Sequence, residues 1–209
     1  MELEDIYDQS GKWHLKARGD TPRYSYTFLN SYFSKKRCSE IVKTTESDIE
    51  LISGYTLSKE RTEDVRECSV GWVKINDAHS PLYRDITDAV LSINNQFWNF
   101  NLSYIEDMQY TVYDSSVWNN PRYDWHQDEG FTRSWCNEIR KLSFICLLSD
   151  PRDFTGGELQ YYADNETRLI PLQQGDVVFF PSPTLHRVTT VTKGIRKTLV
   201  GWVRGPGWT

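Results

Sequence analysis

The spacing of hydrophobic residues predicts helices in the first half of the chain and strands in the second. Between residues 81 and 97, hydrophobic residues recur every three or four positions, which is the spacing of one face of an α-helix. Pro81 marks the start, because proline is well tolerated in the first turn of a helix. We therefore predict a helix that packs on the outside of a sheet through one stripe, formed by Leu82, Ile86, Ala89, Val90, Ile93 and Phe97.

A second, shorter helix is predicted at residues 34–42. Ser34 is a good N-cap residue, because its hydroxyl can accept a hydrogen bond from a free backbone N–H of the first turn. Phe33 directly precedes it. The charged stretch from Ser53 to Asp77 shows little periodicity. We expect a loop or a short hairpin there, in a position to cover an active site.

From Ile105 onward the pattern predicts a series of strands. These β-rich segments are separated by turn signals of Gly, Asn, Asp and Pro, which stand at 119–121, 150–151, 156–157, 164–165 and 174–176. The predicted fold class is mainly β, a double-stranded β-helix (a cupin-like jelly roll) with N-terminal helices packed outside. At 209 residues we expect a single domain. Residues 1–104 would form a supporting region and 105–204 the jelly-roll core.

The stretch around Lys193-Gly194 predicts a β-hairpin, because β-branched runs at 188–191 and 195–200 flank this turn signal. If the loop has three residues, Thr190 lies opposite Arg196, and the two-residue alternation of strands places Arg196 on the face of His186. A two-residue loop would turn Arg196 outward. The residues expected on the shared face are His186, Val188, Thr190, Arg196, Thr198 and Trp202.

Three side chains form a candidate metal site. His126 and Asp128 are separated by a single residue, and His186 follows much later. Two imidazoles and one carboxylate on one face of an ion leave its other positions open, which is the ligand set of non-haem Fe(II) oxygenases. From His186 to Thr190 is roughly 13 Å along a strand. A five-carbon dicarboxylate and the extended guanidinium of Arg196 would bridge that gap, so the expected co-substrate is 2-oxoglutarate.

Several motifs in the same order make the second half of the chain similar to the 2-oxoglutarate- and Fe(II)-dependent dioxygenases, in particular their prolyl-4-hydroxylase-like branch. The resemblance extends from Gln109 to Trp202. Besides the three candidate ligands and Arg196, it includes QYTVY at 109–113, LLSD at 147–150, GGEL at 156–159 and GDVVFFP at 175–181. Trp202, six residues beyond Arg196, completes the pattern.

The resemblance implies roles for several residues in binding 2-oxoglutarate. Arg196 would clamp its distal carboxylate, and Trp202 would belong to the same pocket. A tyrosine on the strand before the first ligand would hydrogen-bond that carboxylate, and Tyr113 is the candidate. The segment between this tyrosine and the first histidine is longer than usual for the family, so Tyr110 and Tyr123 are alternatives.

The resemblance also implies a reaction, the hydroxylation of a carbon atom. Fe(II) would be held by His126, Asp128 and His186, with 2-oxoglutarate and O2 as co-substrates and ascorbate as a further possible cofactor. 2-Oxoglutarate would lose CO2 to become succinate while the substrate gains a hydroxyl. Related halogenases have a small residue in place of the carboxylate ligand, so Asp128 predicts hydroxylation.

A prolyl residue in a peptide or protein is the substrate that the resemblance implies. Arg140 is the candidate for a substrate-side arginine, with Lys141 and Arg133 as competitors. Aromatic residues crowd the segments around the first two ligands and would suit either an extended proline-containing strand or core packing. They are Trp118, Tyr123, Trp125, Phe131 and Trp135.

Two other functions fit the same residues. One is hydroxylation of a free amino acid or another small metabolite. The other is a non-catalytic jelly-roll protein that keeps a metal as a structural or sensory element. Against the latter stands Arg196, because a purely structural metal site has no need for a carboxylate clamp.

Composition excludes several classes of partner. The net charge is −5, which argues against a nucleic-acid substrate because such binding relies on clustered Lys and Arg. No hydrophobic run approaches the length of a membrane span, and the first residues are acidic where a secretory signal would be basic and then apolar. We expect no membrane partner and a cytoplasmic location. The cysteines lack zinc-site or Cys-x-x-Cys spacing, which predicts reduced thiols at Cys38, Cys68, Cys136 and Cys146.

Overall fold

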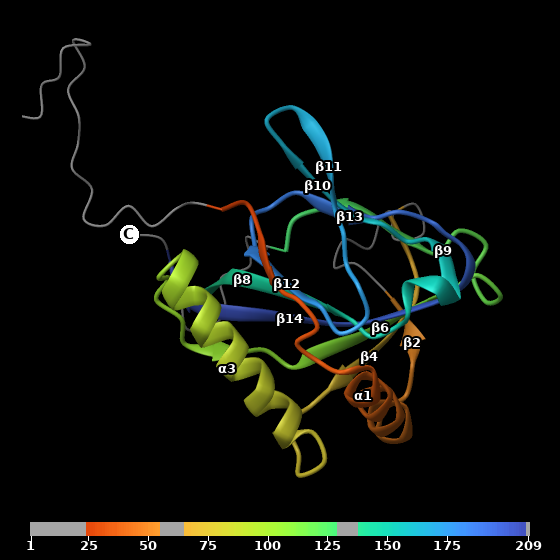
Figure 1. The fold of residues 1–209 in the computed structure, drawn as a ribbon, viewed down its shortest axis with the longest axis horizontal. Coiled ribbons are helices and arrows are strands. Elements are labelled where there is room, and N and C mark those ends of the chain that lie inside the picture. The colour runs from red at the N-terminus through yellow and green to blue at the C-terminus, as the bar shows by residue number, and fades with distance from the viewer. Residues whose placement is uncertain (1–23, 55–64, 129–137, 208–209) are drawn as a thin grey trace, which may run out of the picture.

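The computed structural model describes residues 24–54, 65–128 and 138–207. Within these residues two antiparallel β-sheets face each other, and two long helices cover the outside of the larger sheet (Figure 1). This arrangement is a double-stranded β-helix, so the predicted fold class is confirmed.

Both predicted helices are present. α1 spans Lys35–Asp48, and its N-cap residue Ser34 accepts a hydrogen bond from the backbone N–H of Arg37. α3 spans Ser80–Phe97 and buries the predicted stripe, with Leu82, Ile86, Ala89, Val90 and Ile93 at its centre. Each helix lies on the same side of the larger sheet (Figure 1). The stripe therefore does what its period predicts: it attaches a helix to the outside of a sheet.

The larger sheet has nine strands in the described part of the chain. Seven of them follow one another in space in the order β1 (Thr27–Leu29), β12 (Val177–Pro181), β8 (Glu138–Leu147), β14 (Val191–Pro206), β6 (Met108–Asp114), β4 (Ser69–Val73) and β2 (Ile52–Ser53). β5 (Tyr104–Ile105) and β9 (Phe154–Gly156) pair with β14 as well, and the short 3-10 helix η1 (Pro151–Asp153) precedes β9. β14 is thus the central strand of the fold.

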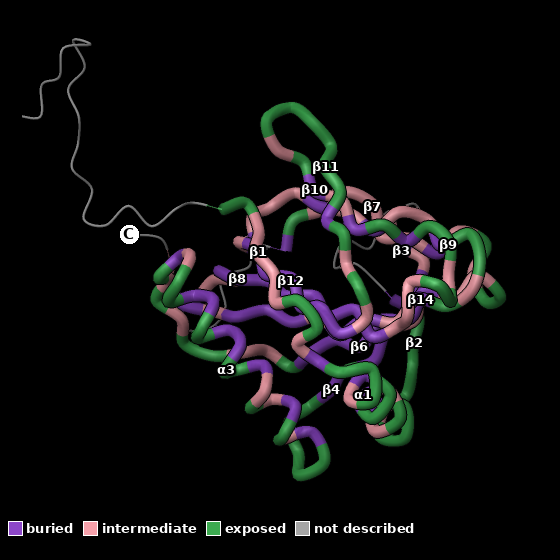
Figure 2. The backbone as a smooth tube through the Cα atoms, viewed as in Figure 1, coloured by how far each residue is buried: buried purple, intermediate pink, exposed green. Residues whose placement is uncertain are grey.

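The smaller sheet has five strands in the described residues. Their order is β11 (Glu166–Ile170), β10 (Leu159–Ala163), β13 (His186–Val188), β7 (Arg122–His126) and β3 (Arg66–Glu67). One hydrophobic cluster joins the two sheets, since Tyr161 and Val188 of the smaller sheet pack with Val178 and Phe180 of the larger one. A second cluster joins the larger sheet to the helices. Figure 2 shows the buried segments concentrated in the larger sheet, between the helices and the smaller sheet.

The predicted hairpin around Lys193-Gly194 is wrong. β13 pairs with β10 and β7 in the smaller sheet, whereas Val191 already belongs to β14 in the larger one. The chain crosses between the sheets at Thr190, whose carbonyl accepts a hydrogen bond from the N–H of Gly157. Gly194 has φ 80° and lies against the carbonyl of Asp153, so this glycine permits a close approach within a strand instead of a reversal.

The first half of the chain contributes strands that its hydrophobic pattern does not predict. β1, β2, β3 and β4 extend the two sheets at their edges. The stretch predicted to be a loop or hairpin contains β2 and β4, which pair with each other, while residues 55–64 lie outside the described part. These strands are only two to five residues long, and tertiary pairing decides their conformation.

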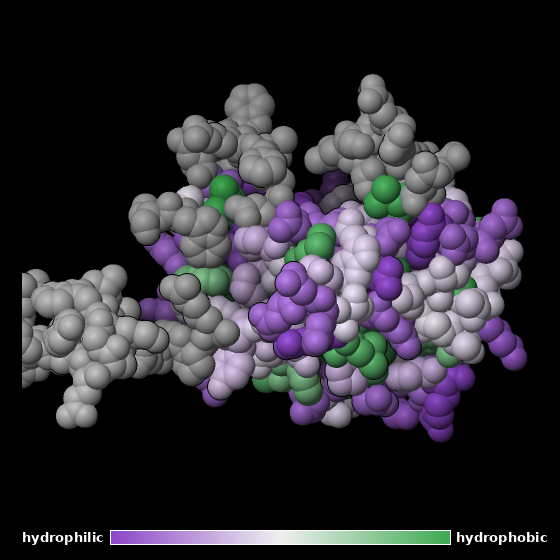
Figure 3. Space-filling view, turned by 90° about the horizontal axis from the view of Figure 1, so that it is seen from above, coloured by the Kyte–Doolittle hydropathy of each residue, from purple (hydrophilic) through white to green (hydrophobic). Residues whose placement is uncertain are grey.

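The described surface is mostly hydrophilic on the face drawn in Figure 3, and the described cysteines are free thiols, as predicted from their spacing. Figure 3 shows mostly hydrophilic side chains on the described part of one face, with hydrophobic side chains in small separate groups. No helix among the described residues is long and apolar enough to cross a bilayer. Cys38, Cys68 and Cys146 are buried free thiols, and Cys136 lies outside the described residues.

Replacing Gly201 by alanine is expected to destabilise the fold. A Cβ at this position in β14 would lie 2.2 Å from Cζ of Phe144, a fully buried ring. Overpacking of this kind lowers the free energy of unfolding by roughly 1–3 kcal/mol. Gly207→Ala is the matched control, because no atom lies within 4 Å of a Cβ there. Chemical unfolding of both variants checks the prediction, and equal free energies of unfolding would contradict it.

Candidate metal centre and cofactor cavity

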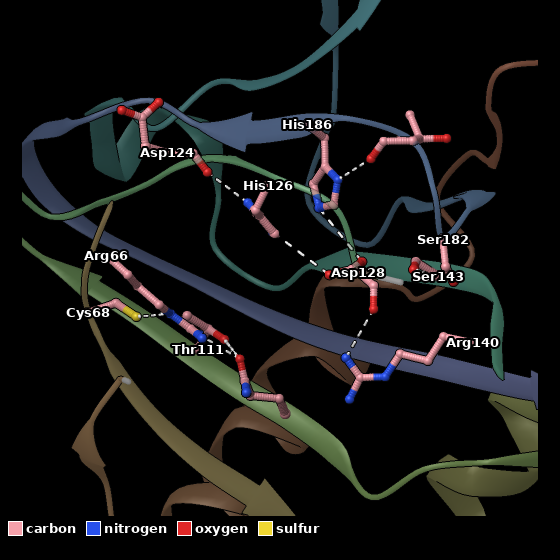
Figure 4. A network of polar contacts seen from close by, with 12 residues as sticks. Arg66, Cys68, Thr111, Asp124, His126, Asp128, Arg140, Ser143, Ser182 and His186 are labelled. Atoms are coloured by element: carbon pink, nitrogen blue, oxygen red, sulfur yellow. Dashed lines mark hydrogen bonds and ion pairs between the residues drawn. The ribbon is translucent and has the colours of Figure 1, made fainter. Parts of the chain in front are cut away.

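Strand pairing brings the three candidate ligands together at the inner face of the smaller sheet. His126 ends β7 and is the register partner of His186 in β13. Asp128 follows two residues later, and its backbone N–H donates to the carbonyl of Ser182. Nε2 of His126 lies 3.8 Å from Oδ1 of Asp128, and Nε2 of His186 lies 3.7 Å from Oδ2 (Figure 4). One possible ligand atom from each residue falls within 4.8 Å of the others.

The hydrogen bonds of the two imidazoles turn the correct nitrogen toward this centre. Nδ1 of His126 lies 2.7 Å from the carbonyl oxygen of Asp124, and Nδ1 of His186 lies 2.8 Å from that of Thr184. A carbonyl oxygen can only accept, so each Nδ1 carries the proton and each Nε2 has a free lone pair. Backbone carbonyls commonly orient metal-binding histidines in this way.

The electrostatics of the centre also suit a cation. Burial, and after it the neighbouring His186, lowers the pKa of His126 to about 3, so this imidazole is neutral. Burial alone would raise the pKa of Asp128, but the two histidines reverse that shift and the net direction is downward. Oδ2 of Asp128 is buried and has no hydrogen-bond donor among the described residues. An unsatisfied buried oxygen costs about 1–3 kcal/mol, which a bound metal ion would offset.

A narrow cavity of about 30 Å³ adjoins the three ligands and lies between the sheets. Its walls combine hydrophobic side chains, Ile145, Val188 and Val200, with polar ones. At this volume the cavity has room for water. A five-carbon dicarboxylate would require the long side chains in its wall to shift.

Arg196 points into this cavity, although the hairpin that was expected to place it does not exist. It pairs with Tyr113 across β14 and β6 and is only 2% exposed. Its Cζ lies 5.5 Å from the centre of the Tyr113 ring. Burial lowers its pKa, and no carboxylate among the described residues pairs with it. Gly157 leaves the space for this side chain, since a Cβ there would lie 2.7 Å from Cδ of Arg196.

Two of the three candidate tyrosines line the cavity, and the third lies on the opposite face of the larger sheet. Tyr113 is buried and lines the cavity, and Tyr123 lines it from β7, stacked on His126 with ring centres 3.5 Å apart. Tyr110 lies three positions before Tyr113, so strand alternation turns it to the opposite face. There its hydroxyl donates to Oε1 of Glu46 in α1. The geometry is compatible with Tyr113 or Tyr123 as a cofactor contact and leaves Tyr110 outside the cavity.

Arg140, the candidate substrate-side arginine, lies beside the cavity, where it contacts Glu106 and Trp202. Its Nε and Nη2 donate to Glu106, and its guanidinium lies 3.9 Å from the ring centre of Trp202. Nη1 reaches the backbone carbonyl of Asp128 at 3.4 Å (Figure 4). Trp202 itself lines the cavity. Of the two competitors, Lys141 is buried and Arg133 lies outside the described residues.

Of the described aromatic residues near the first ligands, Trp118 and Trp125 do not line the cavity. Trp125 points away from it and packs edge-on against Tyr162. Trp118 donates from its indole to the hydroxyl of Ser69. Only Tyr123 of this group is a wall residue, and Phe131 and Trp135 lie outside the described residues. His79, which had no ligand neighbours in sequence, is buried and contacts Asp48 through Nε2.

Sequence reasoning gave no role to three polar residues of the cavity wall, Arg66, Gln109 and Thr111. Arg66 is 8% exposed and belongs to the two-residue strand β3. Its Nη2 donates to Oε1 of Gln109 at 2.6 Å. Nothing in the local sequence of Arg66 distinguishes it from the other charges between residues 60 and 67. Gln109 could have been singled out only as the first residue of the QYTVY motif.

Comparison with known proteins agrees with this site. The family model described as "2OG-Fe(II) oxygenase superfamily" matches residues 108–204. A PKHD-type hydroxylase of Prochlorococcus marinus is 42% identical over 82 residues, which cover 39% of this chain and 36% of that protein. The PKHD-type hydroxylase YbiX of Escherichia coli is 33% identical over 133 residues, covering 61% of this chain and 58% of its own. The chain thus spans little more than a third of the first relative and less than two thirds of the second.

Solved structures extend the likeness to the fold. A prolyl hydroxylase from Trichoplax adhaerens, in complex with a peptide fragment of a hypoxia inducible factor, superposes with a TM-score of 0.70 at 15% identity. The superposition covers 86% of this chain and 83% of that one. The matched residues 108–204, slightly less than half of the chain, contain all three candidate ligands and Arg196, and this part of the chain is similar to the 2OG-Fe(II) oxygenase superfamily. Its fold resembles that of prolyl hydroxylases of known structure.

Removing the carboxylate ligand should abolish metal binding. Mn(II) is expected to raise the thermal unfolding midpoint of the native protein, since a ligand at 100 times its Kd stabilises a fold by about 2.7 kcal/mol. Asp128→Ala should remove that increase. Asp124→Ala is the matched control, because Asp124 contacts His126 only through its backbone carbonyl. Thermal unfolding of the metal-free and Mn(II)-loaded proteins tests this, and an undiminished increase in Asp128→Ala would exclude Asp128 as a ligand.

Proposed function

We propose that this protein is an Fe(II)- and 2-oxoglutarate-dependent hydroxylase that acts on a prolyl residue of a peptide or protein. The single observation that carries the proposal is the combination of two Nε2 atoms directed at a buried carboxylate with the buried Arg196, which has no carboxylate partner among the described residues of the same cavity. A structural metal site would need the first of these features but not the second. The non-catalytic alternative is therefore the weaker one.

The overall reaction balances without a further reductant. 2-Oxoglutarate and O2 react with a substrate C–H bond to give succinate, CO2 and the hydroxylated substrate. One oxygen atom enters succinate and the other enters the substrate. When bound by His126, Asp128 and His186, Fe(II) supplies the activation of O2 that this oxidation requires.

The residues of the chain then have distinct tasks. Arg196 binds the distal carboxylate of 2-oxoglutarate through its guanidinium, a charge-assisted contact strengthened by the low dielectric of the cavity. Tyr113 lies beside that guanidinium and is the first candidate for a second hydrogen bond to the same carboxylate. The hydrophobic wall of Ile145, Val188 and Val200 excludes water from the reacting atoms.

The proposed prolyl substrate rests on family likeness. The relatives are called PKHD-type hydroxylases, and the structural neighbours include prolyl hydroxylases. These names support a hydroxylase, and the neighbour that was solved with a peptide supports a polypeptide substrate. The direct test is anaerobic reconstitution with Fe(II), followed by assay of succinate release with proline-containing peptides.

Each result of that assay has one meaning. Succinate that forms only with 2-oxoglutarate and O2, and a mass increase of about 16 on proline from one added oxygen atom, support the proposed function. Succinate without modification of any peptide would overturn the prolyl assignment and keep the oxygenase. Absence of succinate in every mixture would favour the non-catalytic protein.

Removing the guanidinium of Arg196 should chiefly weaken 2-oxoglutarate binding. Truncating one partner of a buried charge pair costs about 2 kcal/mol or more, which corresponds to at least roughly 30-fold in affinity. Arg196→Met is therefore expected to raise the KM for 2-oxoglutarate by that factor while Mn(II) still stabilises the protein. Lys193→Ala, an exposed residue of the same strand, should leave the KM unchanged. An unaltered KM in Arg196→Met would remove Arg196 from the cofactor site.

A further inference from the structure

Arg66 is a second buried arginine in the cavity, and the proposed reaction leaves it without a task. Its Nη2 donates to Gln109, its Nε lies 3.0 Å from Sγ of Cys68, and its Cζ lies 4.5 Å from the ring centre of Tyr123. Neither an amide nor a thiol carries a compensating negative charge. In the view of Figure 4, Arg66 and Arg140 lie on opposite sides of Asp128, so these two arginines approach the centre separately.

No carboxylate in the described part of the chain pairs with Arg66. This contrasts with Arg122, its neighbour across the β3–β7 pair, which lies 3.2 Å from Oε1 of Glu67. A guanidinium buried without an anion costs several kcal/mol of desolvation. Such an arrangement is commonly kept where a ligand supplies the missing charge.

The charges around the cavity leave one positive charge without a compensating anion. Among the described wall residues, Asp128 contributes −1, while Arg66 and Arg196 contribute +1 each, which gives +1. The histidines are counted as neutral because an imidazole that binds a metal must be deprotonated at the binding nitrogen. Burial raises the pKa of Tyr113 and Tyr123, so both phenols are counted as neutral too. Fe(II) and the two carboxylates of 2-oxoglutarate add +2 and −2. The loaded cavity would therefore keep one uncompensated positive charge.

The neighbours of Arg66 place that charge close to the reacting atoms. The Tyr123 ring is stacked between the Arg66 guanidinium and the imidazole of His126. A single aromatic ring thus separates Arg66 from the first metal ligand. Gln109 uses its Oε1 to accept from Arg66 and from Thr111 at 3.3 Å, which leaves its amide N–H groups as further donors.

We propose that Arg66 and Gln109 form a second carboxylate-binding position, and that the substrate fills it with a carboxylate of its own. The substrate class is then a carboxylic acid whose oxidised carbon lies near that group, such as the C-terminal prolyl residue of a peptide. This inference rests on the proposed oxygenase function and narrows its substrate. The other source of the same chemistry is the proximal carboxylate of 2-oxoglutarate.

Matched acids and amides test the inference. Calorimetry with the Mn(II) protein in the presence of 2-oxoglutarate compares N-acetylproline with N-acetylprolinamide, and the peptide Ala-Pro with its C-terminal amide. The acid of each pair is expected to bind at least about 10-fold more tightly, because one charge-assisted contact is worth roughly 1.5–3 kcal/mol. The preference should disappear in Arg66→Gln and survive in part in Arg66→Lys. It should be unchanged in Arg122→Gln, whose charge already has a partner.

The remaining measurements separate this position from other roles of Arg66. Mn(II) affinity and 2-oxoglutarate affinity should be the same in Arg66→Gln and the native protein. Weaker 2-oxoglutarate binding in that variant would assign the position to the co-substrate and overturn the inference. Loss of Mn(II) binding would mean that Arg66 only supports His126 through Tyr123.

The outcomes for substrate and for function are distinguishable. Equal binding of acid and amide, or no binding of the acid, overturns the inference, whatever the succinate assay gives. Absence of succinate formation with every compound overturns the oxygenase function, even where the acid preference and its loss in Arg66→Gln are observed. Succinate formed equally with acids and amides keeps the oxygenase and removes the carboxylate requirement.

Discussion

The burial of one carboxylate between two imidazoles is the interaction on which the site depends. Asp128 has an oxygen without a donor, and each histidine presents a lone pair to it because a backbone carbonyl holds the proton on the other nitrogen. In water these groups would be hydrated separately. Here the pairing of β7 with β13 fixes both imidazoles, and the packing of the two sheets removes the solvent. The fold therefore buries a carboxylate oxygen that has no hydrogen-bond donor among the described residues. This lowers the free energy of unfolding, as is usual for a preformed binding site.

Strand alternation in the larger sheet separates stability from chemistry. On β6 and β14, one set of alternating residues, including Tyr110 and Leu199, packs toward the helices, while the other, including Tyr113 and Arg196, faces the cavity. The same strand thus serves a hydrophobic core on one side and a polar cavity on the other. Because the parity is fixed by the pleat, no residue of these strands can serve both. Gly201 shows how tight the first side is, since Phe144 already fills the place of its missing side chain.

Much of the fold could be predicted from local pattern, and what failed depended on long-range pairing. The stripe from Leu82 to Ile93 and the cap at Ser34 determine their helices within the segment itself. The three candidate ligands could be singled out from the sequence because their chemistry is specific and their spacing is short or lies within a motif, and the fold brings them together. The partner of β14 could not be found, because a run of β-branched residues predicts a strand without saying which strand lies beside it. Arg66 could not be found either, since its position depends on a two-residue pairing with β7.

The central place of β14 has a consequence for how the protein is made. β6 and β8 leave the ribosome before β14 does, and they do not pair with each other because β14 lies between them in the sheet. β14 is synthesised about 45 residues after β8 ends. Until that late segment emerges, two long hydrophobic strands have exposed edges with unpaired N–H and C=O groups. Nascent chains of this topology are open to aberrant edge-to-edge association, so the same strand that positions Arg196 also ends the interval in which these strand edges are exposed.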